Sequence, residues 1–462
     1  MPTPTDIAVR EVLTKLKDNP YRCPIKFGGK VGTHSTDLHC IVRVETAAGT
    51  QADGYGSMPL GANWSFPANE VDADTKLTVM KRLADRVQAM LPDACDEPHH
   101  PLDHAHTFEP TLFAEADALA REMALPVPIP RMCSLVVNSA FDAAINDAFG
   151  KANGINIYQG YGPDFVTHDL SHYLDQSFAG EYPEQYTLRA PQARMPLYHL
   201  VGALDPLTDS DVKERIDDGL PETLAEWIRT DELTHLKIKL NGDDLDWDVD
   251  RVLAVDRVAD ETDADRPWKY SLDFNECCEN VEYLLAFIDR LKVGSTRAFD
   301  RSQYIEQPTA RNLQTNPDNR MHAAAKLKPV VIDESLVDYG SLLLAEEMGY
   351  SGVALKACKG QSQSVILGAA AQKRGLFLCV QDLTCTDAAF LHSVGLAARI
   401  PGVAAVEGNG RQYCPAANRG WDRLFPGTFR VAQGTIDTGS LTGPGLGCVP
   451  PGREREILEK GL

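Results

Sequence analysis

The sequence has no apolar run long enough to cross a bilayer, and its first twenty residues lack the apolar core of a secretory signal. Basic residues are the scarcer charged class: 45 lysines and arginines stand against 66 aspartates and glutamates, for a formal net charge of −21. So acidic a chain repels nucleic acid and anionic lipid, and neither is expected as a partner. We therefore expect a cytoplasmic protein that acts on small molecules.

Paired cysteine spacings are also missing. The 11 cysteines are scattered, with no CxxC pattern, and only Cys277 and Cys278 are adjacent. This distribution favours reduced thiols over a disulfide framework or a zinc site. The histidines of residues 99–106 lie among prolines, and we expect them in a solvated loop.

The first part of the chain, residues 1–194, mixes strand and helix patterns. Residues 39–49 alternate and are rich in β-branched side chains, which predicts a strand. Helical periodicity covers residues 74–91, 111–124 and 138–154, and the last segment ends at a glycine suited to a C-cap. We expect an α+β domain here. The Gly- and Pro-rich tail, residues 411–462, is expected to pack back onto it.

From residue 195 the sequence pattern changes to short apolar runs separated by amphipathic segments. Eight candidate strands occur: PLYHLVGA, HLKIKLNG, WKYSLDFNE, SQYIEQP, KPVVIDES, GVALKACKG, LFLCVQDL and GVAAVEGNG. Repeated strand–helix alternation predicts parallel βαβ units, and eight of them predict a (β/α)₈ TIM-type barrel over residues 195–410. A doubly wound open sheet is the alternative, although no glycine-rich nucleotide fingerprint follows any strand.

Charged side chains stand at the ends of these strands. They are Lys237, Lys239, Asp273, Glu306, Asp333 and Lys356. From Lys239 onward they are 23 to 34 residues apart, which is the length of one βα unit. Because the carboxyl ends of barrel strands converge on one site, we expect these side chains to meet.

Three carboxylates on neighbouring strands form a hard, all-oxygen ligand set that suits Mg²⁺. Flanking lysines can act as bases when nearby cations lower their pKa to roughly 7–8. Taken singly, each residue has a structural alternative. The lysine pair can be an exposed strand face, and Asp273 and Asp333 can be loop or helix caps.

The motifs KxK at Lys237, DxN at Asp273, EQP at Glu306, DES at Asp333 and LKxxKG at Lys356 resemble, in order, those of the enolase superfamily. Within it they are similar to the muconate lactonizing and dipeptide epimerase subgroup. The resemblance covers the expected barrel and extends to residues 138–162. In that superfamily, a lysine or histidine base works beside Mg²⁺ that stabilises an ene-diolate.

The resemblance implies that Mg²⁺ is held by Asp273, Glu306 and Asp333. It makes Lys239 and Lys356 an acid/base pair, one on each face of a small carboxylate-bearing substrate. A capping domain is implied as well, with mobile loops at residues 27–32 and 54–60 that cover the substrate. A homo-oligomer is expected on the same ground.

Four further residues are expected to bind substrate: Lys237, Asn275, Asp382 and Glu407. The eighth strand lacks the paired aspartates of dipeptide epimerases, and Asp382 stands where a mandelate racemase type has histidine. The resemblance thus favours a racemase or epimerase with two lysines. A lyase or cycloisomerase of the same superfamily stays open, as does a non-catalytic binding protein.

Overall fold

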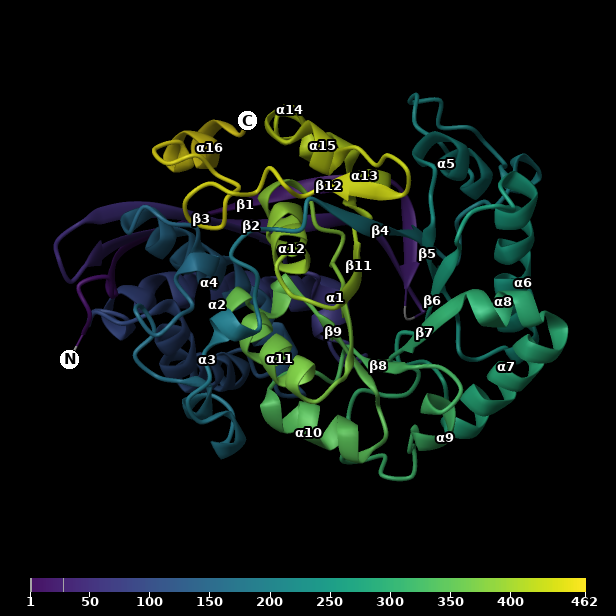
Figure 1. The fold of residues 1–462 in the computed structure, drawn as a ribbon, viewed down its shortest axis with the longest axis horizontal. Coiled ribbons are helices and arrows are strands. Elements are labelled where there is room, and N and C mark those ends of the chain that lie inside the picture. The colour runs from purple at the N-terminus through teal and green to yellow at the C-terminus, as the bar shows by residue number, and fades with distance from the viewer. Residues whose placement is uncertain (1, 28) are drawn as a thin grey trace.

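The computed structural model describes residues 2–27 and 29–462. A capping unit packs against a barrel, and the C-terminal segment runs over both (Figure 1). The cap contains a three-stranded antiparallel sheet in the order β1-β2-β3. Its strands and helices are β1 (Ile7–Phe27), β2 (Lys30–Thr46), β3 (Gln51–Pro59), α1 (Ala62–Ser65), α2 (Ala73–Ala94), α3 (Pro101–Glu122) and α4 (Arg131–Ala152).

Residues 54–60, expected as a mobile covering loop, instead belong mostly to β3, so that expectation is wrong. The glycines there serve close packing against α4. A Cβ atom on Gly54 would lie 2.1 Å from the carbonyl oxygen of Ala144, and one on Gly56 would lie 1.9 Å from that of Ala140. The other expected loop, residues 27–32, includes residue 28, which lies outside the described residues; Lys30 begins β2.

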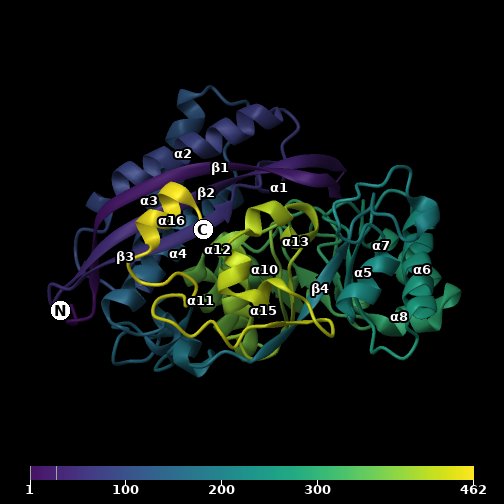
Figure 2. The same cartoon turned by 90° about the horizontal axis from the view of Figure 1, so that it is seen from above.

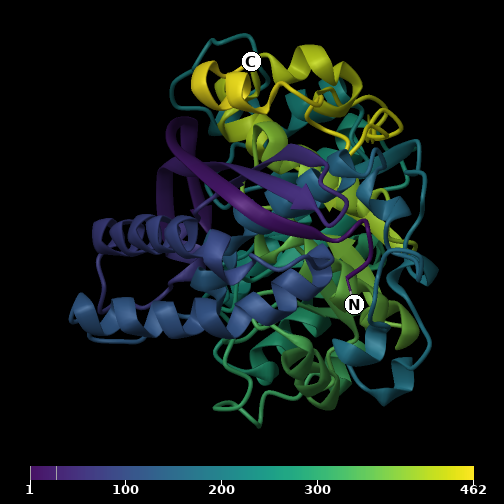
Figure 3. The same ribbon diagram turned by 90° about the vertical axis from the view of Figure 1, so that its left-hand side faces the viewer.

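The histidine-rich segment is also not a loop. Proline is favoured in the first turn of a helix, and Pro101 begins α3, with His100 as its N-cap. His104 and His106 are therefore helical residues. Figure 3 shows α2 and α3 as two long helices projecting from the side of the molecule.

The second unit is a closed barrel. Its eight strands are parallel, and β11 pairs with β4 to close the ring. This confirms the predicted (β/α)₈ barrel with an N-terminal capping domain and excludes the open sheet. The strands are β4 (Arg194–Val201), β5 (His235–Lys239), β6 (Lys269–Asp273), β7 (Ser302–Glu306), β8 (Val330–Ile332), β9 (Gly352–Leu355), β10 (Phe377–Val380) and β11 (Val403–Glu407).

Helices surround the strands, and a cluster of buried side chains that includes Tyr198 and Tyr304 fills part of the barrel interior. The helices are α5 (Leu224–Asp231), α6 (Leu245–Thr262), α7 (Val281–Gly294), α8 (Thr296–Arg301), α9 (His322–Ala325), α10 (Tyr339–Glu347), α11 (Gln361–Lys373) and α12 (Asp387–Ala397). Among residues 2–27 and 29–462, no helix combines the length and hydropathy that a membrane span requires.

The C-terminal segment connects the two units. Strand β12 (Thr435–Asp437) pairs antiparallel with β4, and α16 (Glu454–Lys460) lies against the capping sheet (Figure 2). Arg455 pairs with Asp53 at 2.8 Å. The remaining short helices are α13 (Gly410–Tyr413), α14 (Trp421–Leu424) and α15 (Pro426–Phe429). We propose 1–194, 195–410 and 411–462 as the domain division.

Candidate active site

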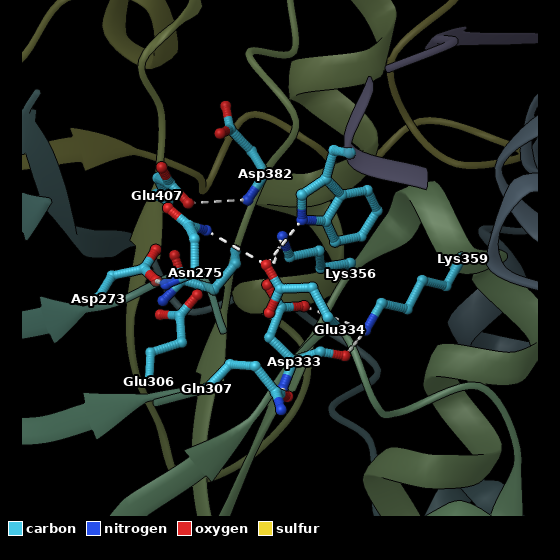
Figure 4. Close-up of polar contacts among 12 residues, drawn as sticks. Asp273, Asn275, Glu306, Gln307, Asp333, Glu334, Lys356, Lys359, Asp382 and Glu407 are labelled. Carbon is cyan, nitrogen blue, oxygen red and sulfur yellow. Dashed lines mark hydrogen bonds and ion pairs between the residues drawn. The ribbon is translucent and has the colours of Figure 1, made fainter. Parts of the chain in front are cut away.

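All six charged residues expected at the strand ends lie at the same end of the barrel and are buried. Lys237 and Lys239 point to the same side of β5 because strand side chains alternate. Register places Lys239 beside Asp273, and Asp273 beside Glu306, on adjacent strands. Asp333 and Lys356 directly follow β8 and β9. Figure 4 shows the carboxylates and Lys356 around a common centre.

On one side of this centre, lysines from β5 pair with carboxylates from β6 and β7. Lys239 Nζ lies 2.5 Å from Asp273 Oδ2 and donates to Asn275 Oδ1 at 2.9 Å. Lys237 Nζ lies 3.1 Å from Asp273 Oδ2 and 2.8 Å from Glu306 Oε1, so it bridges these two carboxylates.

On the other side, two lysines converge on one aspartate. Lys356 Nζ lies 2.8 Å from Asp333 Oδ2. Lys359 Nζ donates to the Asp333 carbonyl oxygen at 2.6 Å and lies 3.1 Å from Oδ1 (Figure 4). Lys359 is buried directly before Gly360, which adopts φ +116° where the chain turns into α11. Lys359 therefore fixes the position of Asp333.

The protonation of these lysines differs from the sequence expectation. Burial is the largest single effect on Lys356 and disfavours its charged form, but the attraction of Asp333, with smaller contributions that include Glu306, raises the pKa of Lys356 above its ordinary value. Burial likewise opposes charge on Lys237, and Glu306, Glu407 and Asp273 together raise its pKa. The expected lowering is thus wrong for Lys356 as it is paired here.

The carboxylates of Asp273, Glu306 and Asp333 meet some of the requirements of a cation site. Glu306 Oε2 is buried and has no hydrogen-bond partner in the described part of the chain. Burial, followed by the repulsion of Asp273, raises the pKa of Glu306 well above its ordinary value. An all-oxygen set of Asp273, Glu306 and Asp333 fits Mg²⁺ in its chemistry. The oxygens of these three carboxylates do not all lie within 4.8 Å of one another. Two other groups of His and Asp residues in the described part of the chain do meet that distance. Lysine contacts separate the three carboxylates.

A cavity of about 250 Å³ lies between this end of the barrel and the cap. Its roof comes from residues 31–36 and 59–64 of the cap. Its floor includes all four residues expected to bind substrate and both expected acid/base lysines: Lys237, Lys239, Asn275, Lys356, Asp382 and Glu407.

Asp382 and Glu407 stand together at the upper edge of this site (Figure 4). The backbone N–H of Asp382 donates to Glu407 Oε2 at 3.3 Å. The Asp382 carboxylate accepts from the backbone N–H groups of Thr384 and Cys385. Burial and the charge of Glu407 raise the pKa of Asp382 to about 7. Asp382 can therefore carry a proton near neutral pH.

Three important residues lie outside the expected set. Trp64 Nε1 donates to Glu334 Oε1 at 2.9 Å, which connects the cap to the barrel. Gln307 Oε1 accepts the backbone N–H of Asp333 at 2.9 Å, and Gln307 adopts φ +31°, a strained value for glutamine. Gln307 and Glu334 belong to the EQP and DES motifs, whereas no sequence pattern distinguished Trp64.

Comparison with solved structures gives the same fold over nearly the whole chain. A muconate lactonizing enzyme from Pseudomonas fluorescens, solved with muconolactone, has a TM-score of 0.60 at 16% identity and covers 98% of this chain and 99% of its own. An N-succinyl Arg/Lys racemase from Bacillus cereus has a TM-score of 0.61 at 16% identity, covering 98% and 97%. A dipeptide epimerase from Enterococcus faecalis, solved with Mg and the dipeptide L-Leu-L-Tyr, has a TM-score of 0.61 at 15% identity, covering 95% and 99%.

No protein of curated function matches the sequence. The sequence model of the family described as "Enolase C-terminal domain-like" matches residues 220–454, which is more than half of the chain. That stretch contains every charged residue identified above at the strand ends. The chain therefore belongs to the enolase C-terminal domain-like family, as a member of the enolase superfamily.

Proposed function

We propose that this protein abstracts the proton beside a substrate carboxylate, with Mg²⁺, as a racemase or epimerase that uses Lys239 and Lys356. The observation that carries the proposal is that these two lysines line one cavity from β5 and β9. The three carboxylate-bearing strands β6, β7 and β8 separate them in the barrel order. A substrate between the lysines would present one face to each.

Asp273, Glu306 and Asp333 would hold the Mg²⁺, and a bound Mg²⁺ supplies positive charge that stabilises an enolate. The dipeptide epimerase named above, which was solved with Mg, supports this choice of metal. Lys237 and Asn275 would orient the substrate carboxylate from the cavity floor. Lys239 and Lys356 would each remove or return the α-proton at Nζ.

The cap contributes to the same chemistry by excluding water. Trp64 lies over Lys356, with Nζ 4.2 Å from the ring centroid, and anchors to Glu334. When the cap residues exclude water from the cavity, electrostatic interactions inside it become stronger. Lys356 must lose its proton to act as a base, so its contact with Asp333 has to loosen when substrate and metal are bound.

A cycloisomerase or lyase with one lysine base is the second candidate. Asp382, with a pKa of about 7 and a place in the cavity wall, offers a proton donor that a pure racemase does not need. The likeness to a muconate lactonizing enzyme fits this alternative as well. A non-catalytic binding protein would need neither lysine.

The test is solvent deuterium exchange. N-acyl amino acids, dipeptides and hydroxy acids would be incubated with the enzyme and MgCl₂ in D₂O and followed by mass spectrometry. The proposal predicts uptake of one deuterium at the α-carbon with inversion. Turnover of a substrate without any α-exchange would contradict it. We also propose a homo-oligomer, which a sedimentation mass near the monomer value of 50.6 kDa would contradict.

A further inference from the structure

A second cluster of ionisable residues lies at the interface between the cap and the barrel. Asp37 and His39 come from β2, and Asp387 is the first residue of α12. One ligand atom of each lies within 4.8 Å of the others. All three residues are buried, and Asp387 is only 1% exposed. They are separate from the carboxylates on β6, β7 and β8.

His39 has an unpartnered nitrogen aimed into this cluster. Its Nδ1 is hydrogen-bonded to the hydroxyl of Tyr55 at 2.8 Å. Its Nε2 has no hydrogen-bond partner in the described part of the chain and faces Asp387 Oδ2 at 3.8 Å. The side chain is 8% exposed, so water does not replace the missing partner freely. Burial lowers the pKa of His39 to about 4, which leaves the imidazole neutral. Either tautomer leaves Nε2 unsatisfied.

Neither carboxylate forms an ion pair with a lysine or arginine that the structure describes. Among the described residues, no lysine or arginine nitrogen lies within 4.0 Å of Asp37 or Asp387. Asp37 Oδ2 accepts from Asn19 and Thr386, and Asp387 Oδ1 accepts from Ser57. Burial is the largest cause that raises the pKa of both carboxylates to about 6; the repulsion of Asp387 adds to it at Asp37, and the positive charge of Lys17 opposes it at Asp387.

The backbone at Asp387 is strained as well. Asp387 adopts φ +44°, a left-handed value that is unfavourable for residues other than glycine. Its backbone N–H donates to Asn418 Oδ1 at 2.9 Å, which holds it in this conformation. In this conformation the Asp387 side chain contacts Ser57 of β3 and faces His39 of β2.

We propose that Asp37, His39 and Asp387 bind a divalent transition-metal ion such as Zn²⁺ or Mn²⁺. Mixed nitrogen and carboxylate ligands suit these ions better than Mg²⁺. Two carboxylates and a neutral imidazole give an uncharged complex with a divalent ion. An ion bound at about 2.0–2.2 Å to each ligand fits between His39 Nε2 and Asp387 Oδ2. It would hold β2 against α12.

This position links the ion to the roof of the cavity. Ser35 and Thr36, next to Asp37 in β2, line the cavity, and so does Thr384, three residues before Asp387. Fixing β2 on the barrel therefore keeps the cap in place over the substrate. The site would be structural, and the proton transfer itself would not depend on it.

Metal content tests the site. Full-length protein would be stripped with EDTA, loaded with ZnSO₄ or MnCl₂, dialysed against MgCl₂, and measured by plasma mass spectrometry and thermal unfolding. We expect about one retained equivalent and a raised Tm. His39→Gln should lose the retained metal and the rise in Tm. Wild-type protein that retains no transition metal, or an unchanged metal content in His39→Gln, would overturn the proposal.

The matched control is the other His/Asp group, Asp103, His168 and His172. It is more exposed, with His168 at 45%, and Asp103 is already bound by His168 and Tyr173. His172→Ala should retain the metal, and loss of metal in that variant would overturn the assignment. If His39→Gln fails to fold, anomalous diffraction from zinc-loaded wild-type crystals decides. A peak at His39 Nε2 supports the site, and its absence there refutes it.

Discussion

The indole of Trp64 covers the ammonium of Lys356, whose Nζ lies 4.2 Å from the centre of the ring. The same indole donates from Nε1 to Glu334. A single side chain from the cap thus contacts one proposed base and the residue that follows a proposed metal ligand. The barrel site is complete only when the cap is in place.

Trp64→Phe keeps an aromatic ring over Lys356 but removes the N–H donor, whereas Trp64→Leu removes both. We expect kcat/KM to fall about tenfold in Trp64→Phe, because leaving the buried Glu334 oxygen without its donor costs roughly 1–3 kcal/mol. Trp64→Leu should fall further, because it also loses a cation–π contact worth roughly 0.5–2 kcal/mol. Steady-state kinetics on the substrate found by exchange would measure this. Trp247→Phe, in α6, is the control and should leave kcat/KM unchanged. Equal rates for both Trp64 variants and wild type would contradict this role.

Glu306→Gln should weaken Mg²⁺ binding and activity together. Glu306 Oε2 is a buried carboxylate oxygen without a hydrogen-bond partner among residues 2–27 and 29–462, and an amide in its place removes the charge that attracts the cation. Isothermal titration with MgCl₂ would measure the affinity. Glu347→Gln, an exposed residue at the end of α10, is the control. A Glu306→Gln enzyme that binds Mg²⁺ like wild type would show that the metal lies elsewhere.

His104 should make the protein sensitive to acid. Burial lowers its pKa to about 4, and Nε2 donates to the Ile7 carbonyl oxygen at 2.6 Å. The unfolded chain binds a proton near pH 6.5 and the folded chain only near 4, so stability is lost as pH falls between these values. The loss is roughly 2–3 kcal/mol. His104→Gln keeps the donor and should lose less stability over that range in urea unfolding. If the free energy of unfolding of wild type and of His104→Gln fell equally between pH 6.5 and 4, this account would be contradicted.

Gly56→Ala should destabilise the cap. The added methyl would lie 1.9 Å from the Ala140 carbonyl oxygen of α4, so strand and helix must separate. We expect a loss of roughly 1–3 kcal/mol or more in the free energy of unfolding. Gly395→Ala, in α12, is the control, since no atom of the described residues lies within 4 Å of its added Cβ. It should be stabilising by about 0.5–1 kcal/mol. A Gly56→Ala protein as stable as wild type would refute this account of β3.

The barrel could be predicted because its strands are short apolar runs that each end in a polar residue. Lys239, Asp273 and Glu306 follow one another at the spacing of one βα unit, so their convergence could be predicted as well. In the cap, local composition led to wrong predictions of secondary structure. Glycines at 54 and 56 indicate a loop by composition, yet they permit the contact of β3 with α4. The prolines around α3 likewise indicated a loop, although Pro101 begins the helix.

Relationships between distant segments could not be predicted. Asp387 meets His39 across about 350 residues, and no local pattern marks either. The contact of Lys359 with Asp333 could not be predicted either, because it joins residues from two different strand ends. The raised pKa of Lys356 also depends on a partner whose distance the sequence does not contain.

The most direct test is α-proton exchange by the two single lysine variants. Lys239→Ala and Lys356→Ala would each be incubated with either enantiomer of the substrate in D₂O with MgCl₂. With one base removed, each variant should lose racemisation by at least about 10³-fold yet exchange the α-proton of one enantiomer, and the two variants should prefer opposite enantiomers. If Lys356→Ala retained full activity toward both enantiomers, the two-base account would be wrong.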